Sequence, residues 1–166
     1  LEPGSQTTLR AELGKVLNHY NKKSNGAFLV ASADLIGSTS VNKTGEGFGQ
    51  GFFNASSNPQ TRLFAVGGIC EDAISGFVSG LGAYGEHIGI ASSYGAFMAP
   101  LGHIAARLHA IGNQARQAIS KEPYRPMILV CAHAGLKTGE DGPTHADPQA
   151  LQLLQENFPQ GTIHTL

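Results

Sequence analysis

The chain has 166 residues with a formal net charge of −1 at pH 7; 41% of them are hydrophobic, 14% are charged and 22 are glycine. This length fits one α/β domain with a substantial core and leaves no room for a second full domain. The balanced charge and the lack of any Lys/Arg run argue against nucleic acid or an anionic membrane as a partner. No apolar stretch approaches the roughly 20 residues that span a bilayer, and no signal peptide is visible.

Charged residues are unusually few, since an ordinary soluble domain contains about 25% of them. A surface so poor in charge predicts that other protein covers much of it. Cys70 and Cys131 lie far apart in apolar contexts, which is typical of reduced thiols in a cytoplasmic protein. Because the sequence begins with Leu1 rather than Met and stops within a predicted strand, we expect residues 1–166 to be a single domain from a longer chain.

Helices and strands are predicted to alternate along the chain. A helix is expected over residues 8–21, because apolar residues recur there at every third or fourth position. Short apolar runs at 27–31 and 62–66 predict two buried strands. Between them, residues 37–61 are rich in Gly, Ser, Asn and Thr without apolar periodicity, and such long loops are usually functional or interfacial.

The later elements continue this alternation. Gly76, Gly80 and Gly82 weaken the next predicted helix intrinsically, so we expect them to permit close packing against another backbone. The whole pattern predicts an α/β fold with a mainly parallel, doubly wound sheet and helices on both faces. The remaining predicted elements are helix 72–81, strand 87–91, helix 101–120, strand 127–132, helix 148–156 and strand 162–166.

Several familiar sites are excluded by their motifs. Gly45, Gly47, Gly49 and Gly51 match neither the dinucleotide-binding Gly-x-Gly-x-x-Gly pattern nor a P-loop. No Gly-x-Ser-x-Gly elbow of a serine hydrolase occurs. Two histidines and an aspartate near the C-terminus could in principle hold a divalent metal, but their spacing matches no metal-binding motif. We therefore expect this domain to bind no metal ion.

The loop over residues 139–145, Gly-Glu-Asp-Gly-Pro-Thr-His, is the most informative stretch of the sequence. It follows the predicted core strand 127–132, and ligands of open α/β sheets bind at the carboxyl ends of the strands. The loop could also be a simple turn in which Thr144 or Asp147 caps the next helix. His133 places a second imidazole at the same strand end, which favours a site with chemistry over a plain turn.

Four motifs, in order along the chain, resemble those of transketolases. Residues 139–145 look like the family's Gly-Glu-Asp-Gly-Pro-Thr-His loop, and 32–38 resemble its Ser-Ala-Asp-Leu stretch followed by a serine. Residues 68–73 are similar to its Gly-Ile-Arg-Glu-His-Ala segment, and 93–97 to its Tyr-Gly-x-x-Phe-type segment. The resemblance covers residues 8–166 and implies the middle, pyrimidine-binding domain of a thiamine-diphosphate enzyme.

The resemblance implies four residues at the cofactor. The family's counterpart of Glu71 hydrogen-bonds the aminopyrimidine ring nitrogen and promotes the tautomer that deprotonates the thiazolium carbon. Phe97 matches the aromatic that stacks on the pyrimidine, and Asp34 resembles a residue near the cofactor and the subunit contact. His103 and Pro100 stand where the family often has further aromatics, so we expect a less aromatic pocket. By itself, Glu71 could be a helix-start carboxylate and Asp34 a turn former.

The resemblance also implies residues that hold the sugar substrate. The family's counterparts of His133, Asp141 and His145 contact hydroxyl groups of the ketose donor and help to move protons, a task suited to imidazoles near neutral pH. Ser38 and Arg10 match positions that hold the sugar phosphate, which a guanidinium can bind through two parallel hydrogen bonds. A solvated surface arginine is an equally good interpretation of Arg10.

The family's other half-site is missing from this sequence. Transketolases bind the diphosphate and its Mg²⁺ or Ca²⁺ with a separate domain that carries a Gly-Asp-Gly motif, and this sequence has no such motif. The resemblance implies an active site between this domain and the diphosphate-binding domain of another subunit in a homodimer. The isolated domain is therefore not expected to catalyse.

The leading hypothesis is transfer of a two-carbon ketol unit between phosphosugars, with thiamine diphosphate as the electron sink. One alternative is deoxyxylulose-phosphate synthase, which shares an Asp-Gly-Pro-Thr-His loop, although His133 favours transketolase. The other is a noncatalytic homologue, kept as a dimerisation or regulatory module. Pro100 and His103 favour that alternative, whereas the retained Glu71 argues against decay of the site.

Overall fold

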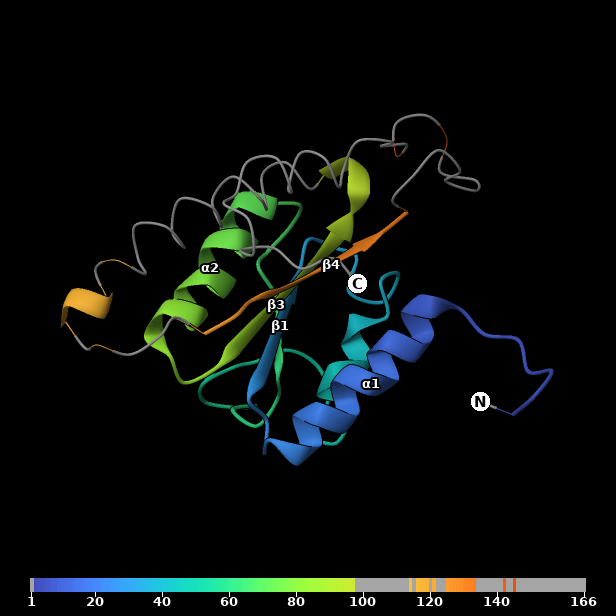
Figure 1. Cartoon of the computed structure of the whole chain (residues 1–166), viewed down its shortest axis with the longest axis horizontal. Helices are drawn as coiled ribbons and strands as arrows, with labels where there is room; N and C mark the ends of the chain where they lie inside the picture. The colour runs from blue at the N-terminus through green and yellow to red at the C-terminus, as the bar shows by residue number, and fades with distance from the viewer. Residues whose placement is uncertain are drawn as a thin grey trace.

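The computed structural model describes residues 2–97, 114, 116–119, 121, 125–133, 142 and 145. The predicted helix over 148–156, the predicted strand over 162–166 and most of the predicted helix over 101–120 lie outside these residues. The described part forms one sheet with helices around it (Figure 1). Its strands are β1 (Phe28–Ser32), β2 (Leu63–Phe64), β3 (Ile88–Tyr94) and β4 (Ile128–Ala132), and its helices include α1 (Leu9–Lys23), η1 (Val41–Gly45), α2 (Glu71–Tyr84) and η2 (Gly95–Phe97).

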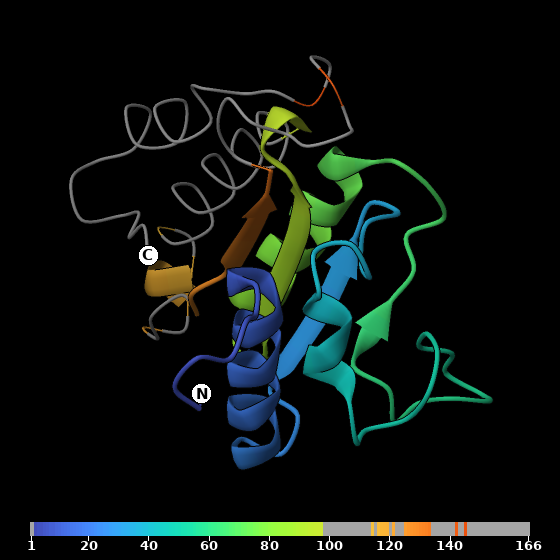
Figure 2. The same ribbon diagram turned by 90° about the vertical axis from the view of Figure 1, so that its right-hand side faces the viewer.

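The strands of this sheet are all parallel and lie in the order β2-β1-β3-β4. In this register Val30 pairs with both Leu63 and Ile90, and Ser93 pairs with Cys131. The helix α1 lies on one side of the sheet and α2 on the other (Figure 2). The predicted α/β fold, with a parallel sheet and helices on both faces, is therefore confirmed.

One face of the sheet packs against α1 and η1. Val30, Ile90 and Val130 come from three neighbouring strands and bury their side chains together with Leu17 of α1 and Val41 of η1. Burial of an aliphatic side chain of this size contributes roughly 1.5–3 kcal/mol relative to an exposed one. This cluster therefore holds α1 and the start of the long excursion against the sheet.

The other face packs against α2. Ala31 and Ala91, the next residues along their strands, are fully buried against Ile74 and Val78. Their small side chains let the helix come close to the strands. The contact is tightest at Gly89 of β3, where an added Cβ atom would lie 2.6 Å from the Cβ atom of Val78. This contact holds the middle of α2 close to the beginning of β3.

The glycines inside α2 differ in what they contact. A Cβ atom added at Gly76 or Gly80 would meet no atom of the described residues within 4 Å. Each of these glycines is two residues from the sheet-facing Val78, which places it about 200° around the helix. The pair therefore faces away from the sheet, and close packing of Gly76 and Gly80 against another backbone stays a prediction. Gly82 is buried.

One buried side chain anchors the excursion that follows β1. Asn21 is 0% exposed; its Nδ2 donates to the carbonyl oxygens of Thr44 (2.9 Å) and Phe28 (3.2 Å), and its Oδ1 accepts from the Phe28 amide (2.8 Å). Asn18 donates to the carbonyl oxygens of Thr44 and Glu46. The excursion is thus held against α1 by hydrogen bonds from two amide side chains and not by a regular backbone ladder.

The strand β3 is longer than the sequence predicts. It continues to Tyr94 instead of ending at Ala91, because Ser92 and Ser93 are fully buried and their hydroxyl groups are hydrogen-bonded. The hydroxyl groups of Ser92 and Thr39 are hydrogen-bonded to each other at 2.9 Å. A buried polar group that is bonded in this way does not end a strand.

The second predicted strand is shorter than expected. The run at 62–66 predicts five residues, but β2 contains only Leu63 and Phe64. Gly67 and Gly68 then adopt positive φ angles of 81° and 152°, which direct the chain away from the sheet towards α2.

In the described part of the chain, no helix has both the length and the hydropathy needed to cross a membrane.

Candidate functional site

All four strands end at one edge of the sheet, called the carboxyl edge below, and predicted site residues follow these ends. Asp34 comes two residues after β1, and Glu71 begins the helix that follows β2. Phe97 ends η2, directly after β3, and His133 follows β4. Because ligands of open parallel sheets bind at this edge, these residues lie where a site is expected.

Glu71 is a buried carboxylate at this edge. Its side chain is 8% exposed, and its Oε1 accepts a hydrogen bond of 2.9 Å from the hydroxyl group of Ser93, which is 0% exposed. The first turn of α2 places the carboxylate in the positive field of the helix N-terminus. Cys70 and Asp72 on either side are exposed, so Glu71 alone of the three turns inward.

Three predicted site residues gather around Tyr94 at the end of β3. The ring of His133 stacks on Tyr94 with centroids 4.3 Å apart and planes at 14°. The ring of His145 meets Tyr94 edge-on at 5.5 Å and Phe97 edge-on at 5.4 Å. The structure therefore brings both imidazoles and the predicted stacking aromatic into one cluster.

Two residues at the carboxyl edge have an uncommon backbone conformation. Asp34 has a φ angle of 62° and His133 one of 52°, in the left-handed region that few residues other than glycine adopt. Each follows the end of a strand, β1 and β4 respectively. Asn25, Ser40 and Lys121 share this conformation, so it directs the chain at Asp34 and His133 without by itself indicating a site.

The two residues predicted to hold a sugar phosphate are in contact. Nη1 of Arg10, in the first turn of α1, donates to the carbonyl oxygen of Ser38 at 2.9 Å, and both residues are exposed. The neighbouring Thr39 donates to Leu35 O at 2.8 Å and lies 2.9 Å from the hydroxyl oxygen of Ser92, which ties the Ser38 loop to β3. The remaining guanidinium donors of Arg10 can therefore meet an anion beside a fixed loop.

Ser93 and Tyr94 were not predicted as site residues. They belong to the motif at 93–97, but the predicted strand ended at Ala91 and left both outside the sheet. Tyr94 is 8% exposed and makes ring contacts with two predicted site residues, and Ser93 touches a third. Continuing the strand to the Tyr-Gly pair would have placed Ser93 and Tyr94 on opposite faces of β3 at the carboxyl edge.

Two predicted site residues cannot be placed. His103 and Asp141 lie outside the described residues, as does the loop over 139–145 apart from Gly142 and His145. Their part in the site stays a prediction. The less aromatic pocket expected from Pro100 and His103 also stays a prediction, because Pro100 lies outside the described residues too. Among the residues that the structure does describe, no group of three or more His, Cys, Asp or Glu side chains could hold a metal ion.

The two thiols are expected to differ in reactivity. Burial raises the pKa of Cys131 to about 12, because desolvation disfavours the thiolate, whereas Cys70 is exposed. At pH 8, iodoacetamide should label Cys70 and spare Cys131, and labelling of Cys131 should rise only as the pH approaches its raised pKa. Peptide mass spectrometry measures both sites, and in urea both should react. Equal labelling of the folded protein at pH 8 would contradict the placement of Cys131.

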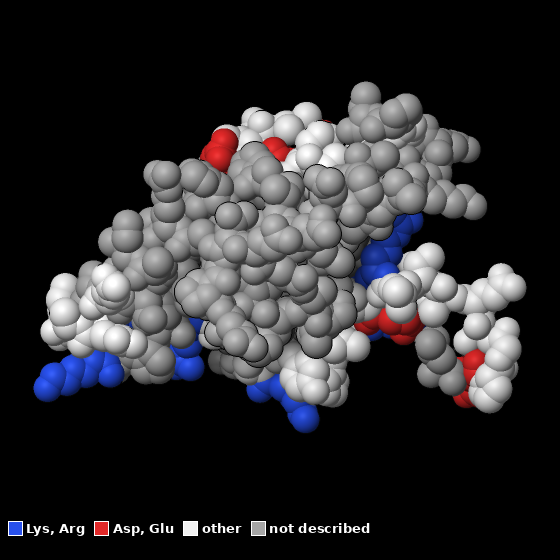
Figure 3. Space-filling view, turned by 45° about the horizontal axis from the view of Figure 1, so that its top comes forward, with Lys and Arg blue, Asp and Glu red and all other residues white. Residues whose placement is uncertain are grey.

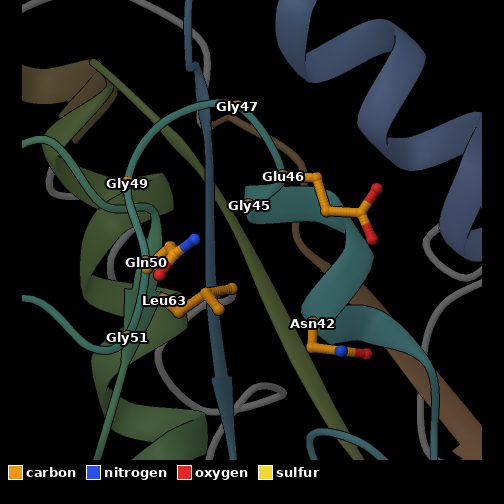
Figure 4. A pocket seen from close by; sticks show the side chains of 8 residues that line it. All are labelled: Asn42, Gly45, Glu46, Gly47, Gly49, Gln50, Gly51 and Leu63. Carbon is orange, nitrogen blue, oxygen red and sulfur yellow. The ribbon is translucent and has the colours of Figure 1, made fainter.

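The glycine-rich part of the long excursion borders an open hollow of about 520 Å³ (Figure 4). The chain arches over it from Gly45 through Gly47 to Gly51, while the side chains of Gln50 and Leu63 lie at its centre. Leu63 begins β2, so the hollow lies towards the amino end of that strand and away from the carboxyl edge. It has no imidazole or thiol among its lining residues, which also include Asn42, Glu46 and Gly49.

Among the described residues, positive charge does not gather on the face shown in Figure 3. Their Lys and Arg side chains lie in separate groups along the border of the view. The net charge of the chain is −1. The described residues visible on this face therefore form no continuous basic patch of the kind that binds polyanions.

Comparison with known proteins gives a family. Residues 5–157 match the family described as transketolase, pyrimidine binding domain. Transketolase from Campylobacter jejuni subsp. jejuni has a similar fold, with 26% identity and a TM-score of 0.63 over 86% of this chain and 19% of that one. No curated protein sequence matches the chain.

Two further solved structures share the fold. Transketolase from Leishmania mexicana is 23% identical with a TM-score of 0.64, over 91% of this chain and 20% of that one. A transketolase variant from Pichia stipitis is 22% identical with a TM-score of 0.65, over 92% of this chain and 21% of that one. The chain thus spans 19% to 21% of the length of the three transketolases.

Proposed function

The chain belongs to the family of transketolase pyrimidine-binding domains, and we propose that it forms the pyrimidine half of a site for ketol transfer between phosphosugars. The observation that carries this proposal is the carboxylate of Glu71, buried at the carboxyl edge and held by a hydrogen bond. A carboxylate that is shielded from water at the ligand-binding edge and held by one hydrogen bond is well placed to meet a ligand with its other oxygen. We further propose that residues 1–166 form one domain of a longer protein.

The residues at the carboxyl edge fit thiamine diphosphate. When bound, this cofactor supplies an electron sink for breaking the bond next to the ketose carbonyl. Glu71 would hydrogen-bond the aminopyrimidine and exchange a proton with it, because its burial favours exchange with a ligand over exchange with water. Phe97 would offer its ring face to the pyrimidine. Asp34 and His103 are proposed to lie near the same cofactor.

The imidazole cluster would serve the sugar. His133 and His145 would hold ketose hydroxyl groups and take up or release protons at their ring nitrogens, together with Asp141. The stacking of His133 on Tyr94 supports this role, since it fixes the plane of the imidazole and so the direction of its nitrogen atoms. The two imidazoles would thus both orient the sugar and exchange protons with it.

The domain is proposed to act only with a second domain. The diphosphate and its Mg²⁺ or Ca²⁺ would be bound by a diphosphate-binding domain of another subunit in a homodimer. An exposed apolar stripe on α1 supports coverage by other protein, since Leu9, Leu13, Val16 and Tyr20 follow each other at helical spacing and are 37% to 92% exposed. Monomeric proteins seldom leave such a stripe open.

The proposed function is tested by combining the chain with its diphosphate-binding domain, thiamine diphosphate and Mg²⁺. We expect ketol transfer from xylulose 5-phosphate to ribose 5-phosphate, measured by the appearance of the seven-carbon product. Condensation of pyruvate with glyceraldehyde 3-phosphate instead would indicate a deoxyxylulose-phosphate synthase. Bound cofactor without either product would indicate a noncatalytic homologue, and both results would contradict the proposal.

Replacing Arg10 with alanine is expected to raise KM for xylulose 5-phosphate about tenfold to a hundredfold, the range for a lost hydrogen bond to a charged group. The value of kcat should change little, because the phosphate lies far from the reacting carbon. Unphosphorylated xylulose is the control, and its KM should stay the same. An equal change for both sugars would indicate a distorted site, and no change for either would make Arg10 a plain surface residue.

A further inference from the structure

We infer that Ser93 is a positioning residue that fixes one oxygen of the Glu71 carboxylate and leaves the other, Oε2, for the cofactor. This inference rests on the proposed function of Glu71. The Ser93 hydroxyl group donates to Oε1 at 2.9 Å, and both side chains are buried, at 0% and 8% exposure. Water therefore cannot readily take the place of the serine.

The backbone around Ser93 makes it a rigid donor. It lies in β3, which has β1 on one side and β4 on the other, and it pairs in register with Cys131. Its side chain points to the same face of the sheet as Ala91, which packs against α2. A short side chain with one rotatable bond on a central strand holds its hydroxyl group more accurately than a loop residue would.

The hydrogen bond also selects where the carboxyl group carries its proton. A serine hydroxyl group has one hydrogen, and Ser93 donates it to Oε1. This bond persists in the ionised and the protonated carboxyl group alike, provided that the proton sits on Oε2. Ser93 thus directs the mobile proton of Glu71 to the oxygen that is free to meet a ligand.

A purely structural role is the competing explanation, and the chain offers a matched control for it. Ser92, the preceding residue, is also 0% exposed, and its hydroxyl group is bonded to Thr39 at 2.9 Å. Its side chain points to the opposite face of β3, away from Glu71. Ser92→Ala therefore removes an equally buried hydroxyl group from the same strand without touching the acid.

The test uses the chain assembled with its diphosphate-binding domain and Mg²⁺, as wild type, Ser93→Ala, Ser93→Cys and Ser92→Ala. Isothermal titration calorimetry measures Kd for thiamine diphosphate. Exchange of the thiazolium carbon's hydrogen for deuterium, stopped with acid and measured by NMR, reports cofactor activation without any sugar. Urea midpoints report stability.

We expect Ser93→Ala to slow deuterium exchange about tenfold to a hundredfold, as for a lost hydrogen bond to a charged group. Ser93→Cys, which keeps the size and a weak donor, should give an intermediate rate. Ser92→Ala should change the exchange rate by less than about twofold, although its urea midpoint falls as much as that of Ser93→Ala. If Ser93→Ala fails to fold, the exchange rate of Ser93→Cys is compared with that of Ser92→Ala instead.

Equal exchange rates in Ser93→Ala and Ser92→Ala would overturn the inference and make Ser93 a structural residue. In that case the proposed function still stands if the wild type activates the cofactor and Glu71→Gln does not. A wild-type assembly that neither binds thiamine diphosphate nor exchanges the hydrogen would overturn the proposed function, and the role of Ser93 with it.

Discussion

Replacing Glu71 with glutamine should lower kcat for ketol transfer at least about a hundredfold, since a general acid–base group contributes roughly 10²–10⁴-fold. The amide keeps the size of the side chain, and its oxygen can still accept the hydrogen bond from Ser93. It cannot gain and lose a proton, which is the property that the proposed role needs. The measurement is kcat of the assembled enzyme at saturating thiamine diphosphate.

Asp72→Asn is the matched control for this substitution. Asp72 also lies in the first turn of α2, so the change removes the same charge from the same helix end. Because Asp72 is exposed, we expect kcat to stay within about twofold of the wild type. A similar loss in both variants would show that the charge of the helix end matters and not the acid itself.

Replacing Asn21 with alanine should lower the free energy of unfolding by about 3 kcal/mol, because each buried group that loses its partner costs roughly 1–3 kcal/mol. The substitution leaves the amide of Phe28 without its side-chain partner, and the carbonyl oxygen of Thr44 keeps only the longer hydrogen bond from Asn18. The excursion after β1 would also lose one of its anchors on α1. Urea denaturation followed by circular dichroism measures the change.

Asn42→Ala is the control for this prediction. Asn42 is exposed at the border of the hollow, on η1, so its loss should change the free energy of unfolding by less than about 0.5 kcal/mol. A loss at Asn21 no larger than the loss at Asn42 would contradict the anchoring role assigned to the buried amide.

The elements with strong apolar periodicity could be predicted from the sequence, and the polar ends of strands could not. The helix expected over 8–21 is α1, and the buried runs at 27–31 and 127–132 are β1 and β4, within one or two residues. The end of β3 was missed because Ser92 and Ser93 look polar in sequence. Their burial depends on partners such as Thr39 that only the folded chain brings near.

The candidate site likewise has residues that the sequence predicts and contacts that it does not. Motif resemblance predicts Glu71 and Phe97 as site residues, but nothing in the sequence indicates that Ser93, 22 residues further along, is hydrogen-bonded to the carboxylate of Glu71. The contact of Arg10 with Ser38 joins residues 28 positions apart and likewise arises from packing. Sequence spacing predicts contacts within one helix or strand, whereas these contacts depend on how separate segments meet.

The central claim is that this chain forms the pyrimidine half of a shared site, and cofactor binding tests it most directly. Isothermal titration calorimetry of thiamine diphosphate with Mg²⁺ would compare this chain, its diphosphate-binding domain and the two combined. The account predicts stoichiometric binding by the combination, with Kd at least about tenfold lower than for either part alone, a difference of about 1.4 kcal/mol. Binding by the diphosphate-binding domain that is unchanged by this chain would contradict it.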